Sequence, residues 1–90
     1  MATVFIPGSM QDLTGGQAEI EVRGSTVRDI IAELDRVHPG VKDWLAEGNR
    51  LKPNFSVAVD GVVSPLGLLQ DVEDDSEVHF VAAISGGRVD

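Results

Sequence analysis

Residues 77–87 read EVHFVAAISGG, an alternating run that passes directly into a tail ending in two glycines. Successive side chains of a strand point to opposite faces, so the run predicts a strand from about Glu77 to Ala82. Its inward set is Val78, Phe80 and Ala82, and its outward set is Glu77, His79 and Val81. The last residues of a domain are commonly frayed, which is one explanation of the tail. The other is that a compact domain, residues 1–83, carries a flexible functional tail, residues 84–90.

The N-terminal part of the chain predicts a β-hairpin. Ala2 to Ile6 is rich in β-branched and aromatic residues, and a second run of this kind follows at Ala18 to Val22. Thr14-Gly15-Gly16 lies between them, where glycine permits a positive φ. Alternation turns Phe5 away from the core, so Phe5 is either partly covered on the second face of the sheet or exposed as an anchor for a partner.

One long helix follows the hairpin. Thr26 and Asp29 resemble a capping box with the shorter acid in place of Glu, and Pro39-Gly40 ends the helix. The apolar side chains of this segment fall on a single stripe, which predicts that the helix covers a sheet. The stripe comprises Val27, Ile30, Ile31, Leu34 and Val37. Residues 41–47 offer another helical turn or two, in which Trp44 is expected to be a lid over the core and not a contact residue.

The remaining segments predict two further strands. Phe55 to Val59 alternates, and Asp60-Gly61 is a strong tight-turn signal into a short strand at Val62-Val63. Three leucines are then expected to tuck under the domain as a short turn, namely Leu66, Leu68 and Leu69. The acidic cluster that follows is expected to form a solvated loop and contains Asp71, Glu73, Asp74 and Asp75.

This order of elements predicts an α+β domain in which one mixed sheet of four to five strands packs a single face on one main helix. With the first hairpin at the centre, the last strand pairs in parallel with the first, and the tail leaves the edge of the sheet freely. This is the β-grasp arrangement of ubiquitin. The predicted core consists of Val4, Ile6, Ile20, Ile30, Ile31, Leu34, Val57, Val59, Val78 and Phe80.

Composition restricts the functions available to this chain. There is no cysteine, which excludes disulfides, cysteine-metal sites and thiol catalysis and favours a cytosolic protein. Seven basic and 15 acidic residues give a net charge of −8, which argues against nucleic acid and anionic membranes and predicts partners with basic surfaces. The chain shows no leader peptide or membrane-spanning run, so a cytoplasmic location is expected.

The sequence shows no recognisable catalytic constellation. The acidic loop lacks the glycine and glutamate that an EF-hand would place at positions 76 and 82. His38 and His79 lie far apart in the sequence, and there is no cysteine or nucleophile motif for them to activate. No phosphate-binding glycine loop occurs either. The chain is therefore expected not to be an enzyme and to bind no metal or cofactor of its own.

Five segments together carry a family resemblance: residues 4–6, 14–17, 25–27, 59–61 and, above all, 78–87. They resemble the ThiS/MoaD group of ubiquitin-like sulfur carriers over nearly the whole chain, and within that group the cysteine-biosynthesis sulfur carrier. The most specific part is the Ala-Ile-Ser-Gly-Gly end placed directly after a strand. Members of the group usually stop at the second glycine, whereas this chain continues with Arg88, Val89 and Asp90.

The resemblance implies a reaction at Gly87. In such carriers, a partner that resembles the ubiquitin-activating enzymes uses ATP to adenylate the terminal glycine carboxylate. The carboxylate is then converted to a thiocarboxylate, which donates sulfur to a synthase. Cysteine biosynthesis is the expected destination, and molybdopterin, thiamine or a secondary metabolite are alternatives. The tail that would enter the partner comprises Ile84, Ser85, Gly86 and Gly87.

The resemblance also implies that residues 88–90 are removed before activation, by a zinc-dependent peptidase of the kind that trims ubiquitin-like tails. A harmless chain end is the alternative. Partners are expected to grip the outward face of the sheet and the base of the tail, through Phe5, His79, Val81 and Ile84. Two other functions remain open: a protein modifier conjugated to lysines through Gly87, and an interaction module with an incidental tail.

Overall fold

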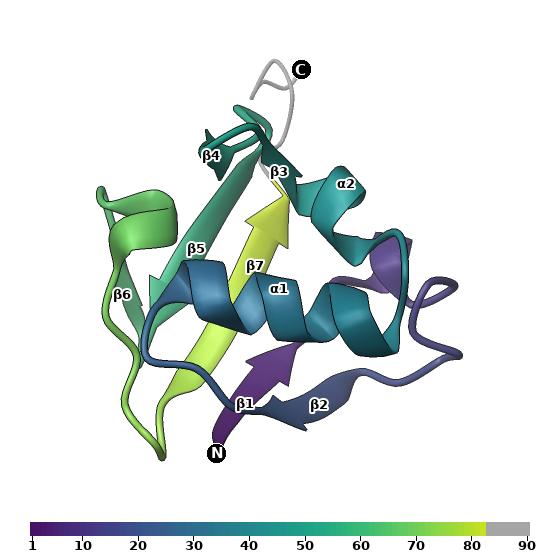
Figure 1. Ribbon diagram of the computed structural model, residues 1–90, viewed down its shortest axis with the longest axis horizontal. Helices are drawn as coiled ribbons and strands as arrows, with labels where there is room; N and C mark the ends of the chain where they lie inside the picture. Colours follow the sequence, from purple (N-terminus) through teal and green to yellow (C-terminus); the bar gives the residue numbers. More distant parts are fainter. Residues whose placement is uncertain (83–90) are drawn as a thin grey trace.

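The computed structural model describes residues 1–82, and every prediction about residues 83–90 lies outside the described residues. Five strands form one mixed sheet in the order β2-β1-β7-β5-β6, and helix α1 crosses one face of it (Figure 1). The strands are β1 Ala2–Phe5, β2 Glu19–Val22, β5 Phe55–Val59, β6 Val62–Val63 and β7 Glu77–Ala82. The helices are α1 Val27–Val37 and α2 Val41–Leu45, with 3-10 turns η1 Gly8–Met10 and η2 Gly67–Leu69. The predicted β-grasp fold is confirmed.

The last strand that the structure describes, β7, is the central strand of the sheet. β7 runs parallel to β1 on one side and antiparallel to β5 on the other. β1 pairs in turn with β2 as the predicted antiparallel hairpin. A parallel pair needs a long crossover connection, which the segment between β1 and β7, α1 included, supplies. The parallel pairing predicted for the first and last strands is therefore confirmed. The prediction that the first hairpin is central is wrong, because β2 is an edge strand and β7, which also pairs with β5, takes the middle position.

The turn between β5 and β6 also fixes the start of β7. Asp60 and Gly61 have φ angles of 53° and 85°, the left-handed pair that a two-residue hairpin turn of this type requires. The Asp60 carboxylate accepts hydrogen bonds from the buried Ser76 hydroxyl and from the Glu77 N–H, both at 2.9 Å. The Asp60 N–H donates to the Glu77 carbonyl at 2.8 Å. Asp60 therefore ties this turn to the first residues of the central strand.

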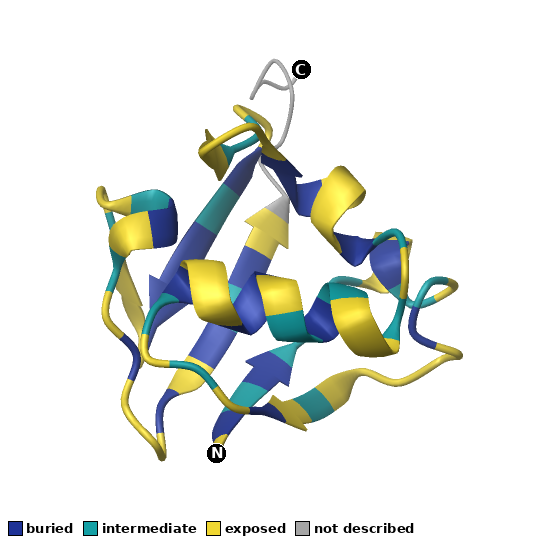
Figure 2. Ribbon diagram, in the orientation of Figure 1, coloured by how far each residue is buried: buried dark blue, intermediate teal, exposed yellow. Residues whose placement is uncertain are grey.

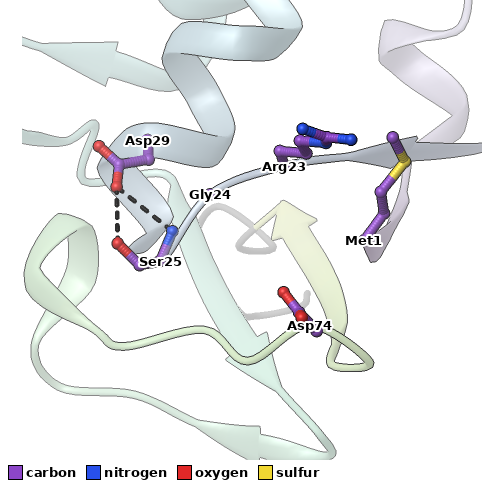
Figure 3. A pocket seen from close by; sticks show the side chains of 6 residues that line it. All are labelled: Met1, Arg23, Gly24, Ser25, Asp29 and Asp74. Carbon is purple, nitrogen blue, oxygen red and sulfur yellow. Dashed lines mark hydrogen bonds between the residues drawn. The ribbon is translucent and has the colours of Figure 1, made fainter.

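Helix α1 begins with a variant of the predicted capping box. The Thr26 hydroxyl accepts a hydrogen bond from the Asp29 N–H at 3.2 Å. The Asp29 carboxylate accepts from the N–H and the hydroxyl of Ser25, one residue before the cap, at 3.3 and 3.1 Å (Figure 3). These bonds from Ser25 lower the pKa of the Asp29 carboxyl below its ordinary value. A Cβ on Gly24 would lie 2.9 Å from the Asp29 Cβ, so the close approach of this segment to α1 requires glycine.

Most buried residues of the strands and of α1, dark blue in Figure 2, belong to one core cluster. Every predicted core residue except Ile20 is buried. Ile20 is only partly buried because it lies on the edge strand β2, which has a neighbour on one side only. Val37 was predicted to face the core and is 49% exposed. At about 100° per residue, Val37 falls at the margin of the α1 stripe, beyond the reach of the sheet.

Two short segments contradict the sequence predictions. Trp44 is 43% exposed and is not a core lid, because the five-residue helix α2 buries Val41 and Leu45 instead. Leu66 and Leu69 are 56% and 70% exposed. Only Leu68 of the three leucines is buried, because η2 is a single 3-10 turn.

Residues 46–51 form a small hairpin that the sequence patterns miss. The strands β3 Ala46–Glu47 and β4 Arg50–Leu51 pair in antiparallel fashion around the turn Gly48-Asn49, where Gly48 has a φ of 65°. The prediction of helical turns through residue 47 is therefore wrong at its end, since α2 stops at Leu45. Strands of two residues are too short to show alternation, which is why this hairpin escaped prediction.

Replacing Ile31 by Ala removes a buried side chain between α1 and the sheet, and we expect the free energy of unfolding to fall by roughly 2–5 kcal/mol. Val37→Ala is the matched control on the same helix, and its loss should be below about 1 kcal/mol because the side chain is half exposed. Urea titration of both variants measures the difference. Equal losses would show that the buried face of α1 is wrongly assigned.

Candidate functional site

The outward face of the sheet, which is turned away from α1, carries a row of side chains that crosses all five strands. Register partners on neighbouring strands place their Cβ atoms side by side on one face. The registers align Phe5 with Glu19 and His79, His79 with Ala58, and Ala58 with Val63. From β2 to β6 the row therefore reads Glu19, Phe5, His79, Ala58 and Val63.

The centre of this row is a stacked pair of rings. The ring centroids of Phe5 and His79 lie 4.1 Å apart, and the two planes differ by 2°. Both residues are half-buried, because each ring covers one face of the other. The structure thus gives Phe5 the partial cover expected from the sequence, and the rest of its ring remains available to a partner.

Val81 and Val63 extend the apolar surface beyond the rings. Val81 follows His79 by two residues and is 50% exposed, and Val63 is 63% exposed. Ala58 lies between His79 and Val63 and is buried without belonging to the core cluster, so its cover comes from outward neighbours. We name Phe5, His79, Ala58, Val63 and Val81 the outward patch.

Ala58 and Val63 are the residues of this patch that sequence reasoning did not name as contacts. The signal was present in the Asp60-Gly61 turn, because a two-residue turn sets Val59 opposite Val62 and therefore Ala58 opposite Val63. Sequence reasoning used the turn to place a strand and did not use it to place a contact residue.

Acidic side chains border the outward patch on one side. Glu19 ends the row of the patch, and Glu21, Thr3 and Glu77 form the neighbouring row. All three glutamates are exposed. An apolar centre with an acidic border favours a partner whose own apolar patch has a basic border. This arrangement agrees with the basic partners predicted from the net charge of −8.

The described part of the chain ends beside this surface. Ala82, the last described residue, is in register with Phe55 at the start of β5, and Val81 of the patch precedes it. Of the predicted contact residues, the structure brings together Phe5, His79 and Val81. The remaining site residues lie outside the described residues: Ile84, Ser85, Gly86, Gly87, Arg88, Val89 and Asp90.

The described part of the chain, residues 1–82, carries no cluster of metal-binding side chains, since no three His, Cys, Asp or Glu side chains are grouped to hold a metal ion. His38 caps the end of α1, where its N–H donates to the Leu34 carbonyl at 2.7 Å, and α1 lies on the other side of the sheet from His79. An open hollow at the start of α1 is lined by both cations and anions, including Arg23, Asp29 and Asp74 (Figure 3). In the same described range, no helix has the length and apolarity needed to cross a membrane.

A sequence model of the ThiS family matches residues 4–87 of the chain, from β1 through β7 to the second glycine of the tail. The chain belongs to the ThiS family. Proteins of the ThiS type with the ubiquitin-like fold are small carriers and not enzymes. This chain is therefore a carrier protein. A comparison with curated protein sequences gives no match.

Solved structures place this ThiS-family chain close to CysO. A chain of the Amycolatopsis orientalis BexX/CysO complex is 30% identical with a TM-score of 0.90, covering 97% of this chain and 100% of that one. Mycobacterium tuberculosis CysO is 24% identical with a TM-score of 0.87, over 93% and 100% of the two chains. Small archaeal modifier protein 1 from Methanosarcina acetivorans is 20% identical with a TM-score of 0.78, over 96% and 95%. The predicted resemblance to ThiS/MoaD-type sulfur carriers is confirmed.

Val62 and Val63 provide a matched pair for testing the outward patch. They are 68% and 63% exposed, but adjacent strand residues point to opposite faces. Val63→Asp should weaken binding to the ubiquitin-activating-type partner that the family resemblance predicts by about tenfold or more, because it places a charge inside an apolar contact. Val62→Asp should change the dissociation constant by less than about threefold, as expected outside a contact. Calorimetric titration compares them, and equal effects of the two substitutions would rule out the outward patch as the docking face.

Proposed function

We propose that this chain is a sulfur carrier whose reactive group is the carboxylate of Gly87. The observation that carries the proposal is the extent of the family match, which runs through β7 into the tail and ends at Gly87. A ubiquitin-activating-type partner would transfer AMP from ATP to this carboxylate and release pyrophosphate. A sulfide-equivalent nucleophile supplied by the partner would then displace AMP and leave a thiocarboxylate. The carrier contributes the carboxylate and a docking surface, and the partner contributes the ATP chemistry.

The position of β7 supports the proposal that the carrier supplies the carboxylate and the partner supplies the ATP chemistry. The tail follows the central strand of the sheet, and five extended residues, the number in 83–87, span roughly 17 Å. A tail of that length can carry the Gly87 carboxylate into a partner's active site while the domain stays outside. Glycine has no Cβ, so Gly86 and Gly87 would pass a narrow channel and leave the carboxylate open to attack.

The outward patch is proposed as the surface that the activating partner holds. Its stacked rings are already ordered in the free carrier, so binding does not have to order them. Val81 lies one residue before the last described residue, which puts the patch at the base of the tail. Ile84 would add an apolar contact where the tail enters the partner.

We propose a synthase of cysteine biosynthesis as the acceptor of the sulfur. The support is the 30% identity to a chain of the BexX/CysO complex over nearly the full length of both chains. By analogy with that complex, this chain would bind its sulfur-accepting synthase directly. A synthase that makes molybdopterin, thiamine or a secondary metabolite is the alternative acceptor.

A proteolytic step must precede activation in this proposal. While Arg88, Val89 and Asp90 are attached, the Gly87 carbonyl is part of an amide and cannot be adenylated. A zinc-dependent peptidase would remove them, with a metal-bound water attacking the Gly87 carbonyl and the Arg88 amine leaving with the tripeptide. The end of the family match at Gly87 supports this boundary. The zinc belongs to the peptidase, and no metal is proposed for the carrier.

Conjugation to lysines of other proteins through Gly87 is the second candidate function. It would begin with the same activation of a diglycine end. The observation in its favour is the shared fold with small archaeal modifier protein 1, which at 20% identity supports the fold alone. Sulfur carriage ranks first because the identity to the CysO-complex chain is higher, at 30%.

Pyrophosphate exchange with the activating enzyme tests the proposal. The full-length protein and a form ending at Gly87 are offered with ATP, and we expect exchange only with the shorter form, because only that form has a free Gly87 carboxylate. A form ending at Ser85 is the control that tests whether exchange requires the two glycines. Equal exchange by the first two forms would show that residues 88–90 are no barrier. Exchange by neither, from folded proteins, would contradict Gly87 as the reactive residue.

A further inference from the structure

A second concave surface lies where η2, β4 and α1 meet. It consists of two hollows that share Asn49 and Leu68. One, of about 400 Å³, lies between η2 and the segment that contains β4 and β5, and the other, of about 90 Å³, lies between α1, α2 and the Gly48-Asn49 turn. We name the joined hollows the η2 cleft. No side chain of the outward patch lines it, and its α1 wall is on the opposite side of the sheet from the patch (Figure 1).

The η2 cleft is lined by cations in a strongly acidic protein. Arg28 and Lys42 line the smaller hollow, and Arg50 lines the larger one. Asp and Glu make up 15 of the 90 residues, yet none of the described residues that line the cleft is acidic. Among the described residues, the only ion pair joins Arg36 to Glu33, outside the cleft. None of the three cations of the cleft therefore forms an ion pair within residues 1–82, and Glu47, which is the register partner of Arg50, does not line the cleft.

The apolar lining of the η2 cleft is mostly aliphatic, and Phe55 is its one aromatic member. Leu68 is buried and forms the shared floor, and Leu51 packs against the core beside the larger hollow. Leu66 and Leu69 line the same hollow with 56% and 70% of their surface exposed. Exposed aliphatic side chains gathered at a concave surface are typical of binding sites.

Hydrogen bonds hold the exposed leucines in place. The Ser64 hydroxyl donates to the Gln70 Oε1 at 2.6 Å and accepts from the Leu66 N–H at 3.0 Å. The Leu69 N–H donates to the Leu66 carbonyl at 3.1 Å. The leucines thus stand on a turn that is already formed, so a ligand does not have to order it on binding.

We propose that the η2 cleft binds a linear segment of a partner protein that combines acidic and leucine-like side chains. The leucine-like side chains would pack on Leu66, Leu68 and Leu69, and the carboxylates would pair with Arg28 and Lys42. The smaller hollow has about three times the volume of roughly 30 Å³ that one water occupies in the liquid, which suits the end of one Asp or Glu side chain. Charge complementarity selects an acidic segment, because the cleft presents three cations and no anion.

A second copy of this chain fits the η2 cleft less well. Its acidic loop, residues 71–75, has exposed acids, but the one apolar side chain within it, Val72, is buried. The described loop therefore offers carboxylates without an accessible aliphatic side chain. A net charge of −8 on each copy also opposes association of two copies.

Amide chemical shifts of the full-length protein test the proposal. The probe is a terminally blocked five-residue peptide of alternating Leu and Glu, and the matched control peptide has Gln in place of each Glu. We expect saturable shifts at Gly48, Asn49 and Gly67 with the acidic peptide. The neutral peptide should bind about fivefold more weakly or worse, since each exposed ion pair contributes a factor of about 1.4–5.

Matched variants assign the binding to the cleft. Arg28→Met and Lys42→Met keep an apolar stem and remove the charge. Each substitution should lower the affinity for the acidic peptide by about two- to fivefold. Arg36→Met, on α1 but outside the cleft, should leave the affinity unchanged.

Four outcomes would overturn the proposal. They are the absence of saturable shifts at millimolar peptide, equal binding of the two peptides, shifts confined to the outward patch, and shifts at the cleft that grow with protein concentration alone. The last result would indicate a second copy as the occupant.

Discussion

The parallel pairing of β7 with β1 is the constraint on which the rest of this structure depends. β7 joins two hairpins, β1–β2 and β5–β6, that would otherwise be separate two-stranded sheets and only marginally stable. The joined sheet is wide enough for α1 to bury one face, and the other face stays open. The same pairing sets Phe5 beside His79 and thereby builds the centre of the outward patch. Because β7 is both the central strand and the last described one, the described chain ends next to that patch.

Sequence patterns predicted the elements that repeat a period or carry a strong local signal. The stripe of α1, the alternation in β7 and the Asp60-Gly61 turn each define a burial pattern by themselves. Single-turn elements carry no such period. Which side chain of α2 or η2 faces the core depends on where the turn docks, and this is why Trp44 and Leu66 were placed wrongly. The β3–β4 hairpin was missed because its strands have two residues each and are too short to show alternation.

In the candidate site, too, local features were predicted from the sequence and features that depend on contacts between elements were not. Alternation alone identified the outward direction of Phe5, His79 and Val81, because direction is a local property of a strand. The stacking of two rings and the contribution of Val63 depend on the register between strands, which local patterns do not encode. The η2 cleft joins α1, the β3–β4 turn and η2, so only the folded chain shows that its cations and leucines lie together. The two surfaces also differ in sign, with an acidic border on the patch and a cationic lining in the cleft, which favours different partner segments at each.

The intact mass of the protein purified from its own cells tests the central claim most directly, because it reports the chemical state of the chain end. A carrier of the proposed kind should be found ending at Gly87, in part with a mass increase that corresponds to sulfur in place of one carboxylate oxygen. Tandem mass spectrometry should place that sulfur on Gly87. A population that ends only at Asp90, or one found only as covalent conjugates to lysines of other proteins, would contradict sulfur carriage at Gly87.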